Sequence, residues 1–227
     1  MSPGATGPVI AIDGPAGAGK STLARRLATT LRLPYLNTGA MYRALTHRAL
    51  DEGIDPDDGP ALAGLLRHMR FDLEWSLMPP ELLVDGRPAG ADLVGLEVEQ
   101  NVSSVSRHPE VRGFMVAEQR RLGEPGAVVE GRDIGTVVFP DAPVKIFLDA
   151  APSERAGRRT HERGGGGDLA ARLETRDALD AKTNPFVPAL DAVRIDTTDR
   201  EADEVYQEAL ALVRRRVGGV GAAGGTG

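Results

Sequence analysis

Four short apolar runs recur along the chain, at Val9 to Ile12, Ala127 to Val129, Val144 to Leu148 and Val193 to Ile195. The first two runs are continuous, and single cations, Lys145 and Arg194, interrupt the other two. Short, largely apolar runs of this kind are typical of strands that are buried in a parallel sheet. Segments long enough for helices separate the runs. Because strand and helix alternate, the pattern predicts an α/β fold with a parallel β-sheet flanked by helices on both faces.

Two of the helices can be placed from their apolar faces. After the first run, Leu23, Leu27 and Leu31 recur at every fourth position, so we expect a helix with one buried face that ends before Pro34. The last helix is expected to begin at a capping box formed by Thr198 and Glu201. Its predicted buried face consists of Val205, Ala209, Leu212 and Val213.

Two segments interrupt the alternation of strand and helix. The first, at about 70–100, contains the alternating stretches FDLEW and ELLVDG on either side of Pro79 and Pro80, which predicts a small antiparallel insert. The second, at about 152–185, contains the four glycines from Gly164 to Gly167. Four consecutive glycines destabilise a helix, so they predict a joint between two charged helices, Ser153 to Arg163 and Asp168 to Ala181.

The second interrupting segment carries seven cationic side chains, six arginines and Lys182, against six carboxylates in an otherwise acidic chain. We interpret it as a helical lid that binds phosphate, and the alternative is a solvated helical hairpin with salt-bridged faces. Residues 9–216 are expected to form a single domain. The first eight residues and the glycine-rich end, 217–227, have too few large side chains to pack and are expected to be flexible tails.

Composition excludes several classes of protein. The chain has 227 residues, no apolar run long enough to cross a membrane and no leader with a basic and then a hydrophobic region, so we expect neither secretion nor membrane insertion. The net charge of -6 argues against a dedicated nucleic-acid binder. With no cysteine there is no disulfide framework, which is compatible with the cytoplasm.

The strongest chemical signal is the stretch GPAGAGKS, a full match to the phosphate-loop (P-loop) motif between a predicted strand and a predicted helix. Its glycines let backbone N–H groups point at phosphate oxygens, Lys20 reaches the β- and γ-phosphates, and the Ser21 hydroxyl is the expected Mg²⁺ ligand. The sequence therefore predicts an ATP-binding loop made of Gly14, Pro15, Ala16, Gly17, Ala18, Gly19, Lys20, Ser21 and Thr22.

A phosphate loop alone fits several activities. There is no guanine-reading motif and no ATP-cassette signature, whereas an insert and a lid suit a kinase that must exclude water from ATP. A nucleotide-dependent switch ATPase and a kinase for a small acid such as shikimate stay open as alternatives at this point.

Four further stretches carry a family resemblance: NTGAMYR at 37–43, EGRDIGT at 130–136, VFPDAPVKIFLD at 138–149 and RDxxD at 176–180. In order and spacing they resemble the bacterial cytidylate kinase family, and the resemblance covers roughly 9–213. It implies a monomer of P-loop NTPase type with a monophosphate-binding insert and a lid, which transfers the γ-phosphoryl group of ATP to CMP or dCMP. UMP and AMP are the nearest rival acceptors.

The resemblance also assigns roles to individual residues. Arg43, Arg132 and Arg176 match the family's monophosphate-binding arginines, whose planar forks suit phosphate. The further acceptor-site residues that it implies are Thr38 and Tyr42 in the pocket wall, Ser103, Arg112 and Asp133 as readers of cytosine, and Asp180 at the pentose.

Catalysis is expected to rest on charge. Besides Lys20 and Arg132, the lid arginines Arg155, Arg158 and Arg159 are expected to neutralise the transferring phosphoryl group when the lid closes. The chain departs from the family pattern at two places. Glu130 replaces an aspartate, which keeps a carboxylate near the metal, and Thr183, preceded by Lys182, replaces an arginine that contacts the sugar.

Overall fold

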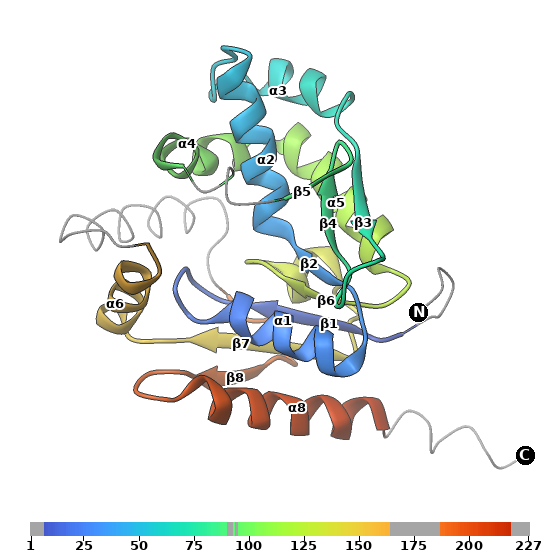
Figure 1. Cartoon of the computed structure of the whole chain (residues 1–227), viewed down its shortest axis with the longest axis vertical. Coiled ribbons are helices and arrows are strands. Elements are labelled where there is room, and N and C mark those ends of the chain that lie inside the picture. The colour runs from blue at the N-terminus through green and yellow to red at the C-terminus, as the bar shows by residue number, and fades with distance from the viewer. Residues whose placement is uncertain (1–6, 90–92, 94, 164–186, 219–227) are drawn as a thin grey trace, which may run out of the picture.

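A central sheet of five parallel strands organises the protein (Figure 1). The computed structural model describes residues 7–89, 93, 95–163 and 187–218. The strand order across the sheet is β2-β6-β1-β7-β8. The strands span Val9–Asp13 (β1), Tyr35–Asn37 (β2), Ala127–Glu130 (β6), Val144–Asp149 (β7) and Val193–Asp196 (β8). The predicted α/β class is confirmed, and all four apolar runs are strands of this sheet.

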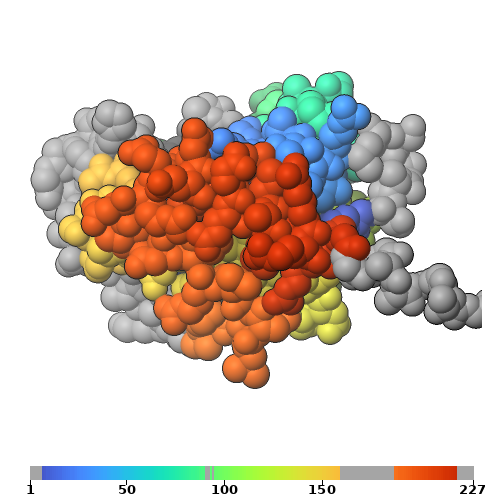
Figure 2. All heavy atoms as spheres, turned by 90° about the horizontal axis from the view of Figure 1, so that it is seen from below, coloured from blue at the N-terminus to red at the C-terminus, as the bar shows by residue number. Residues whose placement is uncertain are grey.

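Helices cover both faces of the sheet at β1, whose successive side chains point to opposite sides. Ile10 and Ile12, both 0% exposed, pack in one cluster with α1 (Lys20–Leu31) and α8 (Ala202–Gly218). Ala11, also 0% exposed, packs in the other cluster with α2 (Thr38–Asp51), α3 (Gly59–Leu66) and α5 (Pro109–Gly123). Figure 2 looks from below onto the side of the molecule where α8 lies.

The predicted antiparallel insert is present as a second, three-stranded sheet. It consists of β3 (Phe71–Glu74), β4 (Glu81–Val84) and β5 (Arg87–Pro88), and Phe71 pairs with Val84 across the first two strands. Helix α4 (Leu96–Ser106) follows and packs against α2. In Figure 1 these elements lie above the central sheet, together with α3 and α5. The limits of the insert, 70–100, and the single-domain limits stay predictions.

The first charged helix of the predicted lid is α6 (Pro152–Arg163). The second lid helix lies outside the described residues, as do Arg176, Asp180, Lys182 and Thr183, the side chain of Arg159 and most of the two tails. None of the described helices combines the length and the apolar character needed to cross a membrane.

The predicted capping box at Thr198 is wrong. Helix α8 begins at Ala202, and the Thr198 hydroxyl accepts a hydrogen bond from the backbone N–H of Ala151 at 2.9 Å instead. At the true start of the helix, the Glu204 carboxylate accepts from the backbone N–H of Glu201 at 3.4 Å. A distant backbone donor therefore takes the hydroxyl that the local pattern assigns to the helix, and the chain continues as a loop for three more residues.

Candidate active site

The predicted phosphate loop connects β1 to α1 and is held between two other elements. Gly14 and Gly17 have φ angles of 144° and 76°, which L-residues with side chains rarely adopt. A Cβ atom on Gly14 would run into the backbone oxygen of Leu148 at the end of β7, and one on Gly17 would lie 2.7 Å from the backbone oxygen of Arg155 in α6. Glycine at both positions therefore lets β7 and α6 pack directly against the loop.

A pocket of about 150 Å³ opens beside this loop. Its walls come from the loop, from α2, α4 and α5, and from the segment after β6. Most of the predicted acceptor residues within the described chain line it, although they are far apart in the sequence. The predicted residues in its wall are Ala16, Lys20, Ser21, Thr38, Tyr42, Arg43, Arg112, Arg132 and Asp133.

One wall of this pocket carries a partly buried ion pair. Nη2 of Arg112 donates to Oδ2 of Asp133 at 2.5 Å, and their side chains are 25% and 13% exposed. Tyr42 lies close to both, and burial, the largest effect, raises its pKa to about 12. Tyr42 therefore stays protonated and neutral. This wall presents a carboxylate, a guanidinium and an aromatic ring to a bound molecule.

The segment after β6 is fastened to the end of β1. Nη1 of Arg132 donates to the backbone oxygen of Gly14 at 2.8 Å. The buried carboxylate of Asp13 accepts from the backbone N–H groups of Ile134 at 2.7 Å and Gly135 at 2.8 Å, where a five-residue π-helix, η2 (Ile134–Val138), begins. Burial raises the pKa of Asp13 to about 6, although these two hydrogen bonds oppose the rise. The segment that carries the predicted monophosphate-binding residue Arg132 is therefore held directly against the start of the phosphate loop.

Two of the predicted lid arginines reach the phosphate loop and its surroundings. Nη1 of Arg155 donates to the backbone oxygen of Ala16 at 3.2 Å. Arg158 donates to the hydroxyl of Thr197 at 2.9 Å and to its backbone oxygen at 2.5 Å. The two guanidinium groups are therefore held by different partners, one at the loop and one at the end of β8.

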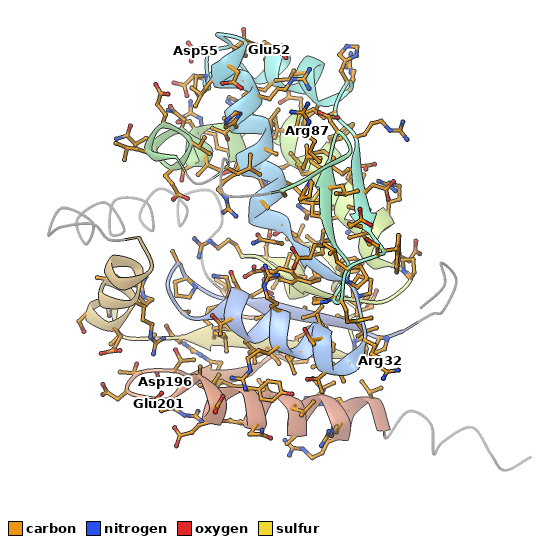
Figure 3. All side chains as sticks on the ribbon, in the orientation of Figure 1. Arg32, Glu52, Asp55, Arg87, Asp196 and Glu201 are labelled. Carbon is orange, nitrogen blue, oxygen red and sulfur yellow. The ribbon has the colours of Figure 1, made fainter. Side chains whose placement is uncertain are left out.

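A second pocket, of about 510 Å³, was not expected from the sequence. The loop residues Gly17 to Gly19 and Thr22 line one side of it, and Arg158 and the segment from Thr197 to Ala202 line the other. Asp196, directly before this segment, and Glu201, within it, are labelled in Figure 3 and lie at the same end of the sheet as α6. The segment is polar and carries no recognisable motif, so nothing in the sequence indicated it.

Two details of the first pocket also differ from expectation. Val102 and Ser106 of α4 line it, whereas Ser103 is buried in the same helix and is not among the lining residues. Gln119, which was not predicted, is 2% exposed, lines the pocket, and its Nε2 has no hydrogen-bond partner in the part of the chain that the structure describes. Gln119 follows Arg112 by two turns of α5, so the two side chains lie on the same face of the helix, and this spacing could have revealed Gln119 from the sequence.

The oxygen atoms around Ser21 fit a hard divalent cation. Ser21 donates from its hydroxyl to Oε2 of Glu130 at 2.9 Å, and both residues line the first pocket beside Lys20. A cation at a phosphate loop needs few protein ligands, because nucleotide phosphates and water complete its shell. The described residues contain no group of three His, Cys, Asp or Glu side chains that could hold a metal ion by themselves.

A phosphate loop at the end of a central parallel strand, facing a second pocket, defines a P-loop kinase-type fold. A solved gluconokinase from Sinorhizobium meliloti 1021 shares this fold with a TM-score of 0.52 and 18% identity, over 95% of this chain and 96% of that chain. The family model described as cytidylate kinase matches residues 10–215, and the chain belongs to the cytidylate kinase family.

Curated relatives extend over nearly the whole chain. A cytidylate kinase of Geobacillus kaustophilus is 49% identical over 92% of this chain and 97% of its own length. A cytidylate kinase of Limosilactobacillus reuteri is 41% identical over 91% of this chain and 95% of its own length. A bifunctional pantoate ligase/cytidylate kinase of Gloeobacter violaceus is 45% identical, but the match spans only 44% of that longer protein. Membership of this family implies ATP and a divalent metal ion.

Proposed function

We propose that this protein transfers the γ-phosphoryl group of ATP to CMP or dCMP. One observation carries the proposal: a single pocket is lined both by Lys20 of the phosphate loop and by the Arg112–Asp133 pair. The first group handles phosphates, and the second presents the hydrogen-bonding groups that a cytosine base needs. The family match supports the same activity.

The choice of base follows from donors and acceptors. Cytosine has an amine donor at N4 and acceptors at N3 and O2, so Asp133 can accept from the amine while Arg112 donates to the acceptors. Uracil reverses two of these groups, and acceptor then meets acceptor while donor meets donor. A site with buried polar groups rejects such a mismatch strongly. We therefore propose that UMP is a poor substrate.

The transfer itself needs no covalent enzyme intermediate. A phosphate oxygen of the acceptor forms a bond to the γ-phosphorus of ATP while the bond to the β–γ bridging oxygen breaks and ADP leaves. Lys20, Arg132 and Arg155 carry positive charge beside the loop where negative charge spreads. We propose that the nucleoside of ATP binds in the second pocket, because Gly17 to Gly19 and Thr22 of the phosphate loop form part of the wall of this pocket.

Mg²⁺ is the divalent ion that we propose. Ser21 would hold it through its hydroxyl, and Glu130 through a water molecule. When bound, the ion supplies positive charge to the phosphate oxygens of ATP. The lid residues Arg159, Arg176 and Asp180 keep their proposed roles at the phosphoryl group, the monophosphate and the pentose. We also propose that the protein is a monomer and that it lies in the cytoplasm.

ADP release in the presence of ATP and Mg²⁺ tests the activity. The acceptors to compare are CMP, dCMP, UMP, AMP, GMP and shikimate, with a reaction without acceptor as the control. We expect release with CMP and dCMP only. Release without any acceptor would favour the switch ATPase, and equal use of UMP would refute the assignment of Arg112 and Asp133. Light scattering coupled to size-exclusion chromatography tests whether the protein is a monomer in solution.

A further inference from the structure

A chain of hydrogen bonds joins the phosphate loop to the start of the acceptor-side helix α2. The Ser21 hydroxyl donates to Oε2 of Glu130 at 2.9 Å, and the Tyr35 hydroxyl donates to Oε1 of the same carboxylate. Nδ2 of Asn37 donates to the Tyr35 oxygen at 3.2 Å. Three separate segments, the start of α1, the strand β2 and the end of β6, therefore meet at one carboxylate.

Glu130 is held by both of its oxygens. It is 3% exposed and Tyr35 is 4% exposed, so water has little access to either. The Tyr35 hydroxyl is the donor toward this carboxylate. In a buried network each bond also orients the next one, so the Tyr35 bond fixes how Glu130 faces Ser21.

Asn37 links this chain to the acceptor side. Its Oδ1 accepts from the backbone N–H of Ala40 at 3.0 Å and caps α2, the helix that carries Thr38, Tyr42 and Arg43. A second connection runs in parallel, because the Thr38 hydroxyl donates to the backbone oxygen of Glu130 at 2.7 Å. The first turn of α2 and the Glu130 carboxylate are therefore held to each other.

The insert holds Tyr35 from the other side. The guanidinium of Arg25 lies over the Tyr35 ring, 4.9 Å from its centre, and pairs with Glu81 of β4. The backbone N–H of Tyr35 donates to the oxygen of Pro80 at 2.9 Å. Contacts on the ring, the hydroxyl and the backbone leave Tyr35 in one position.

We propose that Tyr35, together with Asn37, is a positioning residue that couples the acceptor site to the donor site through Glu130 and Ser21. The proposal rests on the proposed function, since Ser21 is the expected metal ligand and α2 lines the acceptor pocket. Binding of CMP against α2 steadies Asn37, and Asn37 steadies the carboxylate that faces Ser21. Each nucleotide then increases the affinity for the other by the same factor.

Binding measurements on Tyr35→Phe test this coupling, because the substitution removes only the hydroxyl. The quantity to measure is the dissociation constant of CMP with and without a non-hydrolysable ATP analogue and Mg²⁺, by calorimetry. In the wild type we expect the analogue to tighten CMP binding. In Tyr35→Phe we expect this factor to fall by about threefold or more, which corresponds to the loss of one buried hydrogen bond.

Tyr206→Phe is the matched control. The Tyr206 hydroxyl lies 2.6 Å from the Thr30 hydroxyl of α1, so this substitution also removes one hydrogen bond of a tyrosine hydroxyl, and neither of these two residues lines either pocket. We expect it to keep the wild-type coupling factor. A second variant, Asn37→Ser, retains a good helix cap and removes the donor to Tyr35, so it should weaken the coupling even if Tyr35→Phe folds poorly.

The outcomes separate the two proposals. A wild type that releases no ADP with CMP refutes the proposed function. An active wild type without coupling, or Tyr35→Phe and Asn37→Ser proteins that both couple like Tyr206→Phe, overturns the role of Tyr35. Kinetics supply an independent check: at saturating ATP and Mg²⁺ the Michaelis constant for CMP should rise in Tyr35→Phe, and an unchanged constant would also count against the proposal.

Discussion

Replacing Asp13 with asparagine is expected to change how the stability of the protein depends on pH. Burial, the largest effect, raises the pKa of Asp13 from 3.8 to about 6, and the neighbouring Asp133 adds to the rise while Lys20 opposes it. The folded protein therefore prefers the protonated carboxyl group. This contribution to stability is fully present below the unfolded pKa near 4 and is lost as the pH rises through about 6.

The magnitude follows from the size of the pKa change. A rise of roughly two units corresponds to about 3 kcal/mol of unfolding free energy. Asparagine has nearly the same shape and does not titrate. We therefore expect the wild type to lose most of this, about 2.5 kcal/mol, relative to Asp13→Asn between pH 4 and pH 7, whatever the difference between the two proteins at pH 4.

Urea unfolding at a series of pH values measures this difference. Asp196→Asn is the control, since the side chain of Thr198 lowers the pKa of Asp196 at the corresponding end of β8. For that pair the sign is opposite: the wild type should lose stability relative to the variant as the pH falls. If the wild type and Asp13→Asn show parallel pH dependence, the assignment of a raised pKa to Asp13 is refuted.

Three further sets of substitutions test the site. Lys20→Ala should lower turnover at least about 10²-fold, because a preorganised charge beside the transferring group is lost. Lys20→Arg should not restore it, since a planar fork cannot replace a compact ammonium; steady-state ADP release measures both, and normal turnover in either contradicts the role of Lys20. Gly17→Ala and Gly53→Ala both place a side chain at positive φ, which should cost about 1 kcal/mol in thermal or urea unfolding at Gly53 and more at Gly17, where the Cβ also meets a backbone oxygen. Only Gly17→Ala should also reduce turnover, because its Cβ meets the Arg155 oxygen whereas the space at Gly53 is open; equal turnover in the two would count against loop packing as the cause. Asp133→Asn should narrow the preference for CMP over UMP, read as the ratio of the two kcat/KM values, and an unchanged ratio would remove Asp133 from base reading.

The fold could be predicted wherever local sequence decides it. Strands β1, β6 and β7, which are buried on both faces, appear in the sequence as largely apolar runs, and the more exposed edge strand β8 was found as well. Strand β2 was missed because it is only three residues long, directly after Pro34. Its Tyr35 is buried through a bond to Glu130, which lies 95 residues further along the chain. The order of strands depends on such distant contacts and has no local signature.

The site could be predicted where a motif fixes the chemistry. The phosphate loop follows from glycine spacing, and Arg112 and Asp133 followed from the family resemblance. The second pocket could not be predicted, because Thr197 and its neighbours are ordinary polar residues of a loop. The same loop misled the capping-box prediction, since Ala151 takes the Thr198 hydroxyl. In both cases a contact with α6 or with the segment before it decides what the loop does.

The strand order also makes the molecule modular. Strands β2 and β6 are neighbours, so everything between them, from α2 to α5, leaves the sheet and returns beside the same edge. The phosphate loop belongs to β1 and α1, which precede that excursion. The excursion carries Tyr42, Arg43 and Arg112 of the acceptor pocket, whereas Arg132 and Asp133 follow β6 and stay with the phosphate-donating frame. A graft of this excursion from a relative with another acceptor would therefore have to include the segment after β6 in order to alter specificity.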